Sequence, residues 1–471
     1  MSCPRHMKND FDLGQENELQ QLLAPLGPEG QRIAFAHLPA VFAPLLAEIK
    51  KINPIIAIIA GTNGKGETIY RLQQTLAQQG WKTAMWISPH ILSLRERMTL
   101  GNALISYAQL QQVLRQTRAT LALSPAGKSL SYYEFLFYAF LQAVIDYRPQ
   151  VLLLEVGLGG RLDAVNLFDA ELCVLTSISR DHQAFLGTTY RAILQEKLGV
   201  TRPGQNVISA LELKYLRQLM QPQATREHWQ WHDLFEENIL QQDDLYPKRN
   251  AALAAAAAKV VQELGKNRWA IVTAPSGESH QGPAADGSLP FGLAWPGRRE
   301  GWPKIKGHQD FRATPEDRSL AEYEQLDRWL FIGGHNVDGL RKMMAYLAQE
   351  KIKVTTILAS FSQRPYDDLK TNLALLGLMP GHPRIILAAF NHPKAVDQIT
   401  LQNLARDVCL AVPIKVECWH QQLEENLNHE AGTTLVTGSF YFVGLVQRSL
   451  LHQYGRGFGV CPGRSDSGDF R

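Results

Sequence analysis

Hydrophobic positions along the chain fall into short β-branched runs and longer segments with helical spacing. Residues 55–60 (IIAIIA) form an apolar run between Pro54 and Gly61, which is typical of a strand buried on both faces. Apolar positions at Ile69, Leu72 and Leu76 then predict a helix ending near Gln79. Further strands are predicted at 82–88, 151–154, 172–178 and 206–210, and helices over much of 14–50 and at 107–122, 131–147, 188–198 and 250–264. This alternation predicts an α/β fold with a doubly wound, mostly parallel sheet.

A second series of predicted strands and helices begins near residue 329 and indicates a smaller, Rossmann-like α/β domain. Its strands are predicted at 329–331, 354–358, 385–390, 414–418 and 434–437. Between the two series, residues 273–317 are rich in Gly, Pro, Ser and charge, which favours a domain linker with a loop insertion. Residues 211–248 are polar with no clear period, so no regular element is predicted there, and the tail 456–471 is predicted to be disordered.

Composition narrows the class of protein rather than its chemistry. A length of 471 residues indicates two or three domains, and 45% hydrophobic with 20% charged residues describes an ordinary soluble chain. The net charge of +3 and the lack of a basic stripe give no support for a nucleic-acid partner, and no apolar run reaches membrane-spanning length. The N-terminal sequence has no signal-peptide core. The five cysteines have no metal-ligand spacing, so a reduced, cytoplasmic location is expected. They are Cys3, Cys173, Cys409, Cys418 and Cys461.

The glycine-rich segment after the first strand carries the strongest chemical signal. It reads Gly61-Thr62-Asn63-Gly64-Lys65-Gly66-Glu67-Thr68 and opens the predicted helix. A strand, a glycine turn and a helix start form a phosphate cradle, because backbone N–H groups and the positive end of the helix dipole face the anion. The alternative is an ordinary strand-to-helix turn with a surface lysine. The segment from Gly61 to Thr68 is not a standard Walker A loop. Gly66 separates Lys65 from the positions where a magnesium-binding hydroxyl would be sought, and Glu67 and Thr68 occupy those positions.

Two more candidates follow predicted strands. Glu155 ends the strand at 151–154, and Asp181 with His182 follows the strand at 172–178. Ligands of open α/β sheets bind outside the carboxyl ends of the strands, so Glu155 and His182 can hold a divalent cation beside the phosphate cradle. Each side chain has a simpler alternative as a hydrogen-bonded loop residue.

Motifs occur in a fixed order along the chain. They are AGTNGKGET at 60–68, SPHI at 88–91, ERMTLGNALIS at 96–106, EVGLGGRLDAVN at 155–166, TSISRDHQAFLG at 176–187, QEKLG at 195–199, NAALA at 250–254, WPGR at 295–298 and TGSFY at 437–441. This series resembles the folylpolyglutamate synthase/dihydrofolate synthase family of the Mur ligase superfamily. The resemblance implies a P-loop-containing, Mur-ligase-like ATP-binding domain over 1–296 and a C-terminal glutamate-ligase domain over 297–455.

The resemblance implies an ATP-dependent amide ligase that acts as a monomer with magnesium and a monovalent cation such as K⁺. The γ-phosphoryl group of ATP would activate a carboxylate of dihydropteroate or of a folate, and the amine of L-glutamate would displace the phosphate. Implied catalytic residues are Lys65, Lys197 and His182. Implied nucleotide contacts are Gly61 to Thr68, Asn250, Arg298 and His335. Implied metal ligands are Glu155, His182, Glu67 and Lys197, the last as a carbamate, and implied folate contacts are Ser88, Pro89, His90, Arg97, Arg161 and Asp163.

The chain departs from the family pattern at several positions. Glu67 replaces the serine that coordinates magnesium, and Ile332 and Val337 replace the aspartate and proline of DGAHNP. These departures leave open a second hypothesis, a degenerate relative that binds ATP or folate without efficient ligation and has a regulatory or binding role. A third hypothesis is a Mur-like ligase with another acceptor acid. The choice between dihydropteroate and folate as acceptor also stays open.

Overall fold

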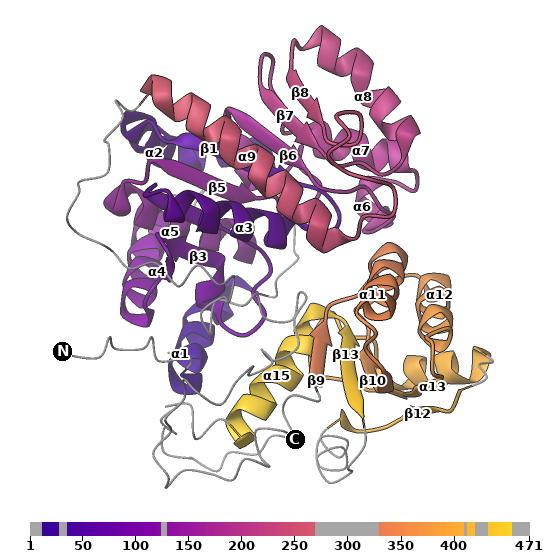
Figure 1. Cartoon of the computed structure of the whole chain (residues 1–471). Coiled ribbons are helices and arrows are strands. Elements are labelled where there is room, and N and C mark those ends of the chain that lie inside the picture. Colours follow the sequence, from indigo (N-terminus) through magenta and orange to yellow (C-terminus); the bar gives the residue numbers. More distant parts are fainter. Residues whose placement is uncertain are drawn as a thin grey trace, which may run out of the picture. The chain divides into compact units, whose positions relative to one another are not determined.

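The computed structural model describes residues 12–27, 35–123, 130–268, 329–408, 412–419 and 432–454. They fall into two compact units, each with its own sheet (Figure 1). The larger comprises the described residues within Glu18–His90 and Leu94–Gly282, and the smaller those within Met1–Asn17, Ile91–Ser93 and Pro283–Arg471. The limit predicted at 296/297 lies outside the described residues, so the domain boundaries remain a prediction.

The larger unit is built on an eight-stranded sheet with strand order β4-β3-β2-β5-β1-β6-β7-β8. The strands are β1 (Ile55–Ala60), β2 (Thr83–Trp86), β3 (Met98–Leu100), β4 (Ala103–Leu104), β5 (Val151–Glu155), β6 (Leu172–Leu175), β7 (Asn206–Ser209) and β8 (Gln230–Asp233). All neighbouring strands are parallel except β2 with β3 and β3 with β4, which are antiparallel. The predicted mostly parallel sheet is confirmed, and β1 lies between β5 and β6 at its centre.

Helices pack against this sheet (Figure 1). They are α2 (Leu38–Ile52), α3 (Lys65–Gln78), α4 (Tyr107–Ala122), α5 (Tyr132–Tyr147), α6 (Gln183–Leu186), α7 (Tyr190–Leu198), α8 (Lys214–Arg226) and α9 (Tyr246–Arg268). Helix α1 (Leu13–Leu23) is divided between the two units after Asn17. Helix α3 packs along α9, and α5 packs against both α2 and α4. Ser106 and Ser131 begin α4 and α5 with complete capping boxes, which explains why these helices start where the sequence predicts.

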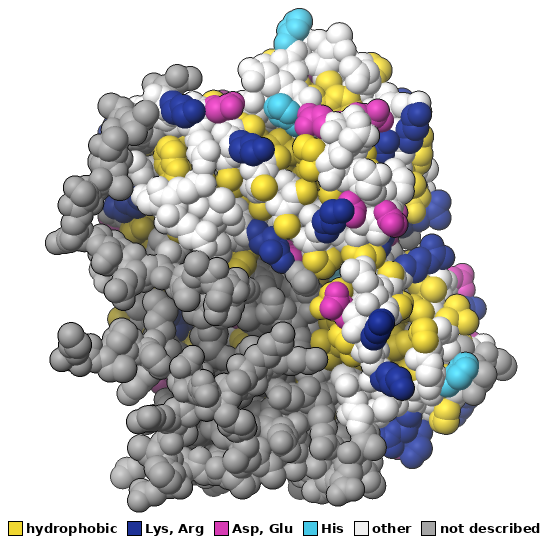
Figure 2. Space-filling view, viewed as in Figure 1, with side chains coloured by type: hydrophobic (Ala, Val, Ile, Leu, Met, Phe, Trp, Pro, Cys, Tyr) yellow, Lys and Arg dark blue, Asp and Glu magenta, His cyan; other side chains and the backbone are white. Residues whose placement is uncertain are grey.

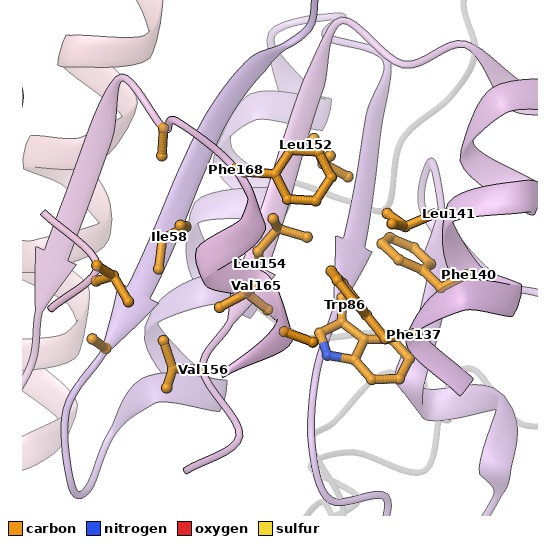
Figure 3. Packing of buried hydrophobic residues seen from close by; sticks show 14 of the residues in the cluster. Ile58, Trp86, Phe137, Phe140, Leu141, Leu152, Leu154, Val156, Val165 and Phe168 are labelled. Carbon is orange, nitrogen blue, oxygen red and sulfur yellow. The ribbon is translucent and has the colours of Figure 1, made fainter. Parts of the chain in front are cut away.

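Aromatic side chains of α5 form the centre of the core. The Trp86 ring of β2 lies 5.3 Å from Phe137 and 5.6 Å from Phe140, measured between centroids, and Trp86 is level with Leu154 of β5 (Figure 3). The aromatic stretch of α5 is therefore part of the core. This packing joins the two strands whose carboxyl ends carry Ser88 and Glu155.

Two expectations from the sequence were wrong. Residues 211–248 contain α8 and β8; the buried side of α8 includes Leu216, Met220 and Ala224 at a spacing of i, i+4 and i+8, a period hidden by the polar residues between them. Helix α9 does not end at Gly265 but continues to Arg268. A Cβ at Gly265 would lie 2.1 Å from the Trp81 ring, so this glycine permits close packing and does not terminate the helix.

The smaller unit contains a five-stranded parallel sheet of order β12-β11-β10-β13-β9, as the second series predicted. Its strands are β9 (Trp329–Ile332), β10 (Val354–Ser360), β11 (Arg384–Leu387), β12 (Ile414–Val416) and β13 (Thr433–Gly438). Its helices include α11 (Val337–Gln349), α12 (Tyr366–Gly377), α13 (Gln398–Asp407) and α15 (Phe440–Tyr454). Within the described residues, no helix is long and apolar enough to cross a membrane. On the described part of one face, basic, acidic and hydrophobic side chains are interspersed (Figure 2).

Candidate functional site

The glycine-rich loop between β1 and α3 has a backbone that only glycine accommodates at two positions. Gly61 has φ 146°, and a Cβ there would lie 1.9 Å from Thr176 Oγ1. Gly64 has φ 87°, and a Cβ there would lie 2.5 Å from Asn250 Oδ1. Gly64 is the N-cap of α3 and Lys65 is its first residue, so the loop ends at the positive end of the helix dipole.

The segment that follows β6 holds this loop in place. Thr62 N donates to Ser177 O at 2.8 Å, and Asn63 N donates to Ser177 Oγ at 2.9 Å. Thr176 Oγ1 donates to Asn63 O at 2.7 Å, and Ser179 N donates to Thr62 Oγ1 at 3.0 Å. Sequence reasoning missed these supporting residues, although their place after β6, the neighbour of β1, was available as a signal.

Glu155 and His182 lie after strands on either side of β1. Glu155 is the buried last residue of β5, level with Ile59 of β1, and its Oε2 accepts a hydrogen bond from Ser88 N at 3.1 Å. His182 follows β6 with φ 50°, and its side chain is 54% exposed. The strand ends thus bring a buried carboxylate and an exposed imidazole to the same edge of the sheet as the glycine loop.

Lys197 of α7 is buried and reaches the glycine loop from a third direction. Its Nζ donates to Gly61 O at 2.8 Å. Desolvation by burial, together with the positive charge of Lys65, lowers the pKa of Lys197 from 10.5 to about 7, while Asp181 and Asp163 oppose the shift. Near neutral pH a large fraction of this amine is therefore uncharged.

A magnesium ion implied by the family can be tested against these groups. No cluster of three or more His, Cys, Asp and Glu side chains suited to a metal occurs in the part of the chain that the structure describes. Magnesium bound to a nucleotide needs only one or two protein ligands, since phosphate and water oxygens complete its shell. Glu155 offers a buried carboxylate, and Thr68 in the first turn of α3 offers a buried hydroxyl that has no hydrogen-bond partner among the described residues. This donor chemistry fits magnesium.

Glu67 interacts with side chains on two helices. Its Oε1 lies 2.8 Å from Arg71 Nη2 and 2.9 Å from Arg71 Nε, and its Oε2 accepts from Asn250 Nδ2 at 2.8 Å. Asn250, in the second turn of α9, is buried. Sequence reasoning missed Arg71, although a Glu and an Arg spaced i and i+4 on a helix form a recognisable pair.

The residues expected to contact folate separate into groups. Arg97 is buried, and its Nε donates to His90 Nδ1 at 2.9 Å, while Ser88 N reaches Glu155; Pro89 follows Ser88. Arg161 instead pairs with Glu196, with its Nη2 2.9 Å from Oε1. The structure therefore brings His90 and Arg97 together and Ser88 to Glu155, whereas Arg161 pairs with Glu196 of α7.

Asp163 stabilises the loop that follows β5. Its Oδ2 accepts from Gly157 N and Leu158 N, both at 3.0 Å, and its Oδ1 accepts from Val165 N at 3.1 Å and from Tyr133 OH at 3.0 Å. Burial, followed by the charge of Asp163, raises the pKa of Tyr133, so the phenol stays protonated and donates.

Replacing Asp163 by alanine is expected to lower the free energy of unfolding by about 3 kcal/mol, because several buried donors lose their acceptor together. Urea unfolding checks this value. Asp169→Ala is the matched control, since the Asp169 side chain pairs with Arg202 but is 89% exposed; its expected cost is below about 1 kcal/mol. Equal costs for the two variants would contradict this role of Asp163.

Of the nucleotide contacts expected after residue 290, the described residues include His335. His335 follows β9; its ring lies 5.1 Å from the Phe440 ring, and its carbonyl accepts from Asn372 Nδ2 at 3.3 Å and from Arg364 Nη1. Ile332 ends β9 and packs in the apolar core of the smaller unit. Arg298 lies outside the described residues.

The carboxyl edge of the smaller sheet carries a polar cluster that the sequence reasoning missed. His392 stacks on Tyr441 with centroids 4.0 Å apart, and Lys394 Nζ lies 3.3 Å from Tyr441 OH. Both His392 and Lys394 follow β11, and Tyr441 follows β13. Position after a parallel strand was the signal that identifies them as candidates.

Comparisons with known proteins show which enzymes this chain is similar to. No protein-family model matches the chain. The chain is 24% identical over 432 residues to a dihydrofolate synthase/folylpolyglutamate synthase of Bacillus subtilis, covering 83% of this chain and 89% of that protein. It is 36% identical over 195 residues to the enzyme of the same name from Haemophilus influenzae, covering 39% of this chain and 42% of that protein.

A solved structure agrees with the fold. It is the bifunctional folylpolyglutamate synthase/dihydrofolate synthase of Yersinia pestis complexed with AMPPNP and Mn, with a TM-score of 0.65 and 23% identity over 95% of this chain and 100% of that chain. The likeness in sequence runs through most of both chains, and the fold and the ordered motifs agree with it. This chain is therefore similar, through most of its length, to the dihydrofolate synthase/folylpolyglutamate synthases, and it shares the fold of the solved enzyme.

Proposed function

We propose that this chain is an ATP-dependent ligase that adds L-glutamate to dihydropteroate, to the glutamate tail of folates, or to both. The observation that carries the proposal is the glycine loop, with Lys65 at the start of α3 and the buried amine of Lys197 on Gly61 O. Members of the family named above carry out this reaction, as their names state.

The chain's own groups fit a reaction that needs positioning and charge neutralisation more than a nucleophilic side chain. Loop N–H groups and Lys65 bind the phosphates of ATP, with Asn250, Arg298 and His335 as further nucleotide contacts. Glu155, Thr68, His182 and the carbamate of Lys197 are the groups that would hold magnesium, which neutralises phosphate charge when bound. Arg97, paired with His90, lies in the loop region proposed to bind the folate.

The second hypothesis, a degenerate binding protein, rested on Glu67 together with Ile332 and Val337. By itself, a carboxylate at position 67 would repel the phosphates of ATP. The guanidinium of Arg71 lies within 2.8 Å of Glu67 and balances its charge, so the repulsion is reduced. No observation favours the degenerate hypothesis over the ligase.

One reaction tests the proposal and identifies the acceptor. Purified protein is incubated with ATP, magnesium, glutamate and either dihydropteroate or tetrahydrofolate, and products are read by mass. The expected result is ADP formation together with a product heavier by one glutamyl unit with at least one acceptor. Absence of both in every mixture, with K⁺ present, would overturn the ligase proposal. Light scattering on the same sample tests the proposed monomer.

A further inference from the structure

Helices α3 and α9 are linked by one carboxylate at the base of the glycine loop. Glu67 lies in the first turn of α3, and its two oxygens are used differently: Oε1 by Arg71 of the same helix and Oε2 by Asn250 of α9. The Glu67 side chain is 16% exposed, so water screens the Glu67–Arg71 pair only partly. We call Glu67, Arg71 and Asn250 the clamp.

The clamp fixes which way the Asn250 amide faces. Because Nδ2 donates to Glu67, Oδ1 is directed toward the loop, where a Cβ at Gly64 would come within 2.5 Å of it. Tyr246, in the first turn of α9, accepts a hydrogen bond from Asn63 Nδ2 at 3.2 Å. The start of α9 thus holds the glycine loop at Asn63 and lies against it at Gly64.

The positive charge of Arg71 offsets the repulsion between Glu67 and bound phosphates. An uncompensated carboxylate beside bound phosphates would oppose nucleotide binding, whereas a carboxylate paired with a guanidinium adds little net charge. The N-terminal turn of α3 also favours a negative side chain. The loop can therefore carry a carboxylate where small hydroxyl residues are usual.

We propose that Glu67 is a positioning residue that orients Asn250 against the glycine loop, and that it does not ligate the metal ion. The inference rests on the proposed function only in taking Asn250 as a nucleotide contact. Glu67 and Arg71 together therefore contribute to nucleotide binding, and this contribution does not depend on magnesium.

Calorimetric titration of ADP into Glu67→Gln, Arg71→Met and the double variant, with EDTA and then with magnesium, tests the inference. Glutamine keeps an acceptor for Asn250 or for Arg71 but not the charge that binds both. Each single variant is expected to raise the magnesium-free Kd about tenfold, which corresponds to ~1.4 kcal/mol. The double variant is expected to be no weaker than either single one, since both changes break the same clamp. The ratio of Kd values with and without magnesium should stay as in the unmodified protein.

A matched control comes from α2, where Glu48 pairs with Lys51 at 2.6 Å on the surface. Glu48→Gln is expected to leave both Kd values unchanged. If Glu67→Gln weakens binding only when magnesium is present, and Arg71→Met has no effect, Glu67 is a metal ligand and the inference fails. A lower melting temperature with unchanged Kd values would overturn it as well, because the clamp would then be merely structural. Failure of the proposed function appears differently, as absence of a glutamylated product from the unmodified protein, whether or not that protein binds ADP.

Discussion

Replacing Lys65 by methionine is expected to lower kcat for glutamate ligation by about 100- to 1,000-fold, the usual cost of removing a preorganised group that stabilises transition-state charge. Lys65 opens α3, and its Nζ lies 3.2 Å from Thr62 O, so the ammonium group stays at the glycine loop. Methionine keeps the length of the side chain and removes the charge.

Steady-state ligation assays at saturating ATP measure this loss. Lys50→Met, at an exposed position in the last turn of α2, is the control and should retain full activity. A loss below about fivefold for Lys65→Met would mean that the loop N–H groups and the metal ion suffice for phosphate binding.

Replacing Lys197 by methionine is expected to lower kcat by about 100-fold, the upper range for groups that support a metal site. An uncharged amine adds to CO₂ to form a carbamate and releases a proton, whereas the ammonium form does not react. Because the pKa of Lys197 is about 7, the reactive fraction is small at pH 6 and large at pH 8. Carbamylation should therefore rise with pH over this interval.

Isotope-labelled bicarbonate allows the carbamate to be observed directly by ¹³C NMR. The expected result is a carbamate signal at pH 8 that is weak at pH 6 and absent in Lys197→Met. Activity at pH 8 should fall in CO₂-free buffer and return when bicarbonate is added. Full activity without CO₂, with no carbamate signal, would assign Lys197 the simpler role of holding Gly61 O.

Local signals explain what could be predicted from the sequence. The strand at 55–60, the glycine loop and the start of α3 are consecutive, so their interactions are encoded in neighbouring residues. The strands of the smaller unit could be predicted because each is a short apolar run of consecutive residues. Helix α8 was missed because its apolar positions are separated by polar and charged residues, and the end of α9 because Trp81, the partner of Gly265, is far away in the sequence.

Contacts between distant segments explain which features of the site could not be predicted from the sequence. The position of Glu67 suggested a side chain that faces phosphates, and nothing in the neighbouring sequence indicates Asn250 as its partner. Ser177 and Tyr246, which hold the glycine loop, also come from distant segments. Arg71 is the exception, because its i, i+4 spacing from Glu67 could have been recognised.

The hydrogen bonds from residues 176–179 to the glycine loop also affect how fast a nucleotide can bind. Fixing the backbone of a flexible residue costs roughly 1–2 kcal/mol of conformational entropy, and here that cost is met when the protein folds. The nucleotide then enters a cradle that is already formed. Its binding free energy is not reduced by the entropy cost of ordering Thr62 and Asn63. Association should therefore be set by diffusion and charge steering, with a rate constant that falls as salt is added.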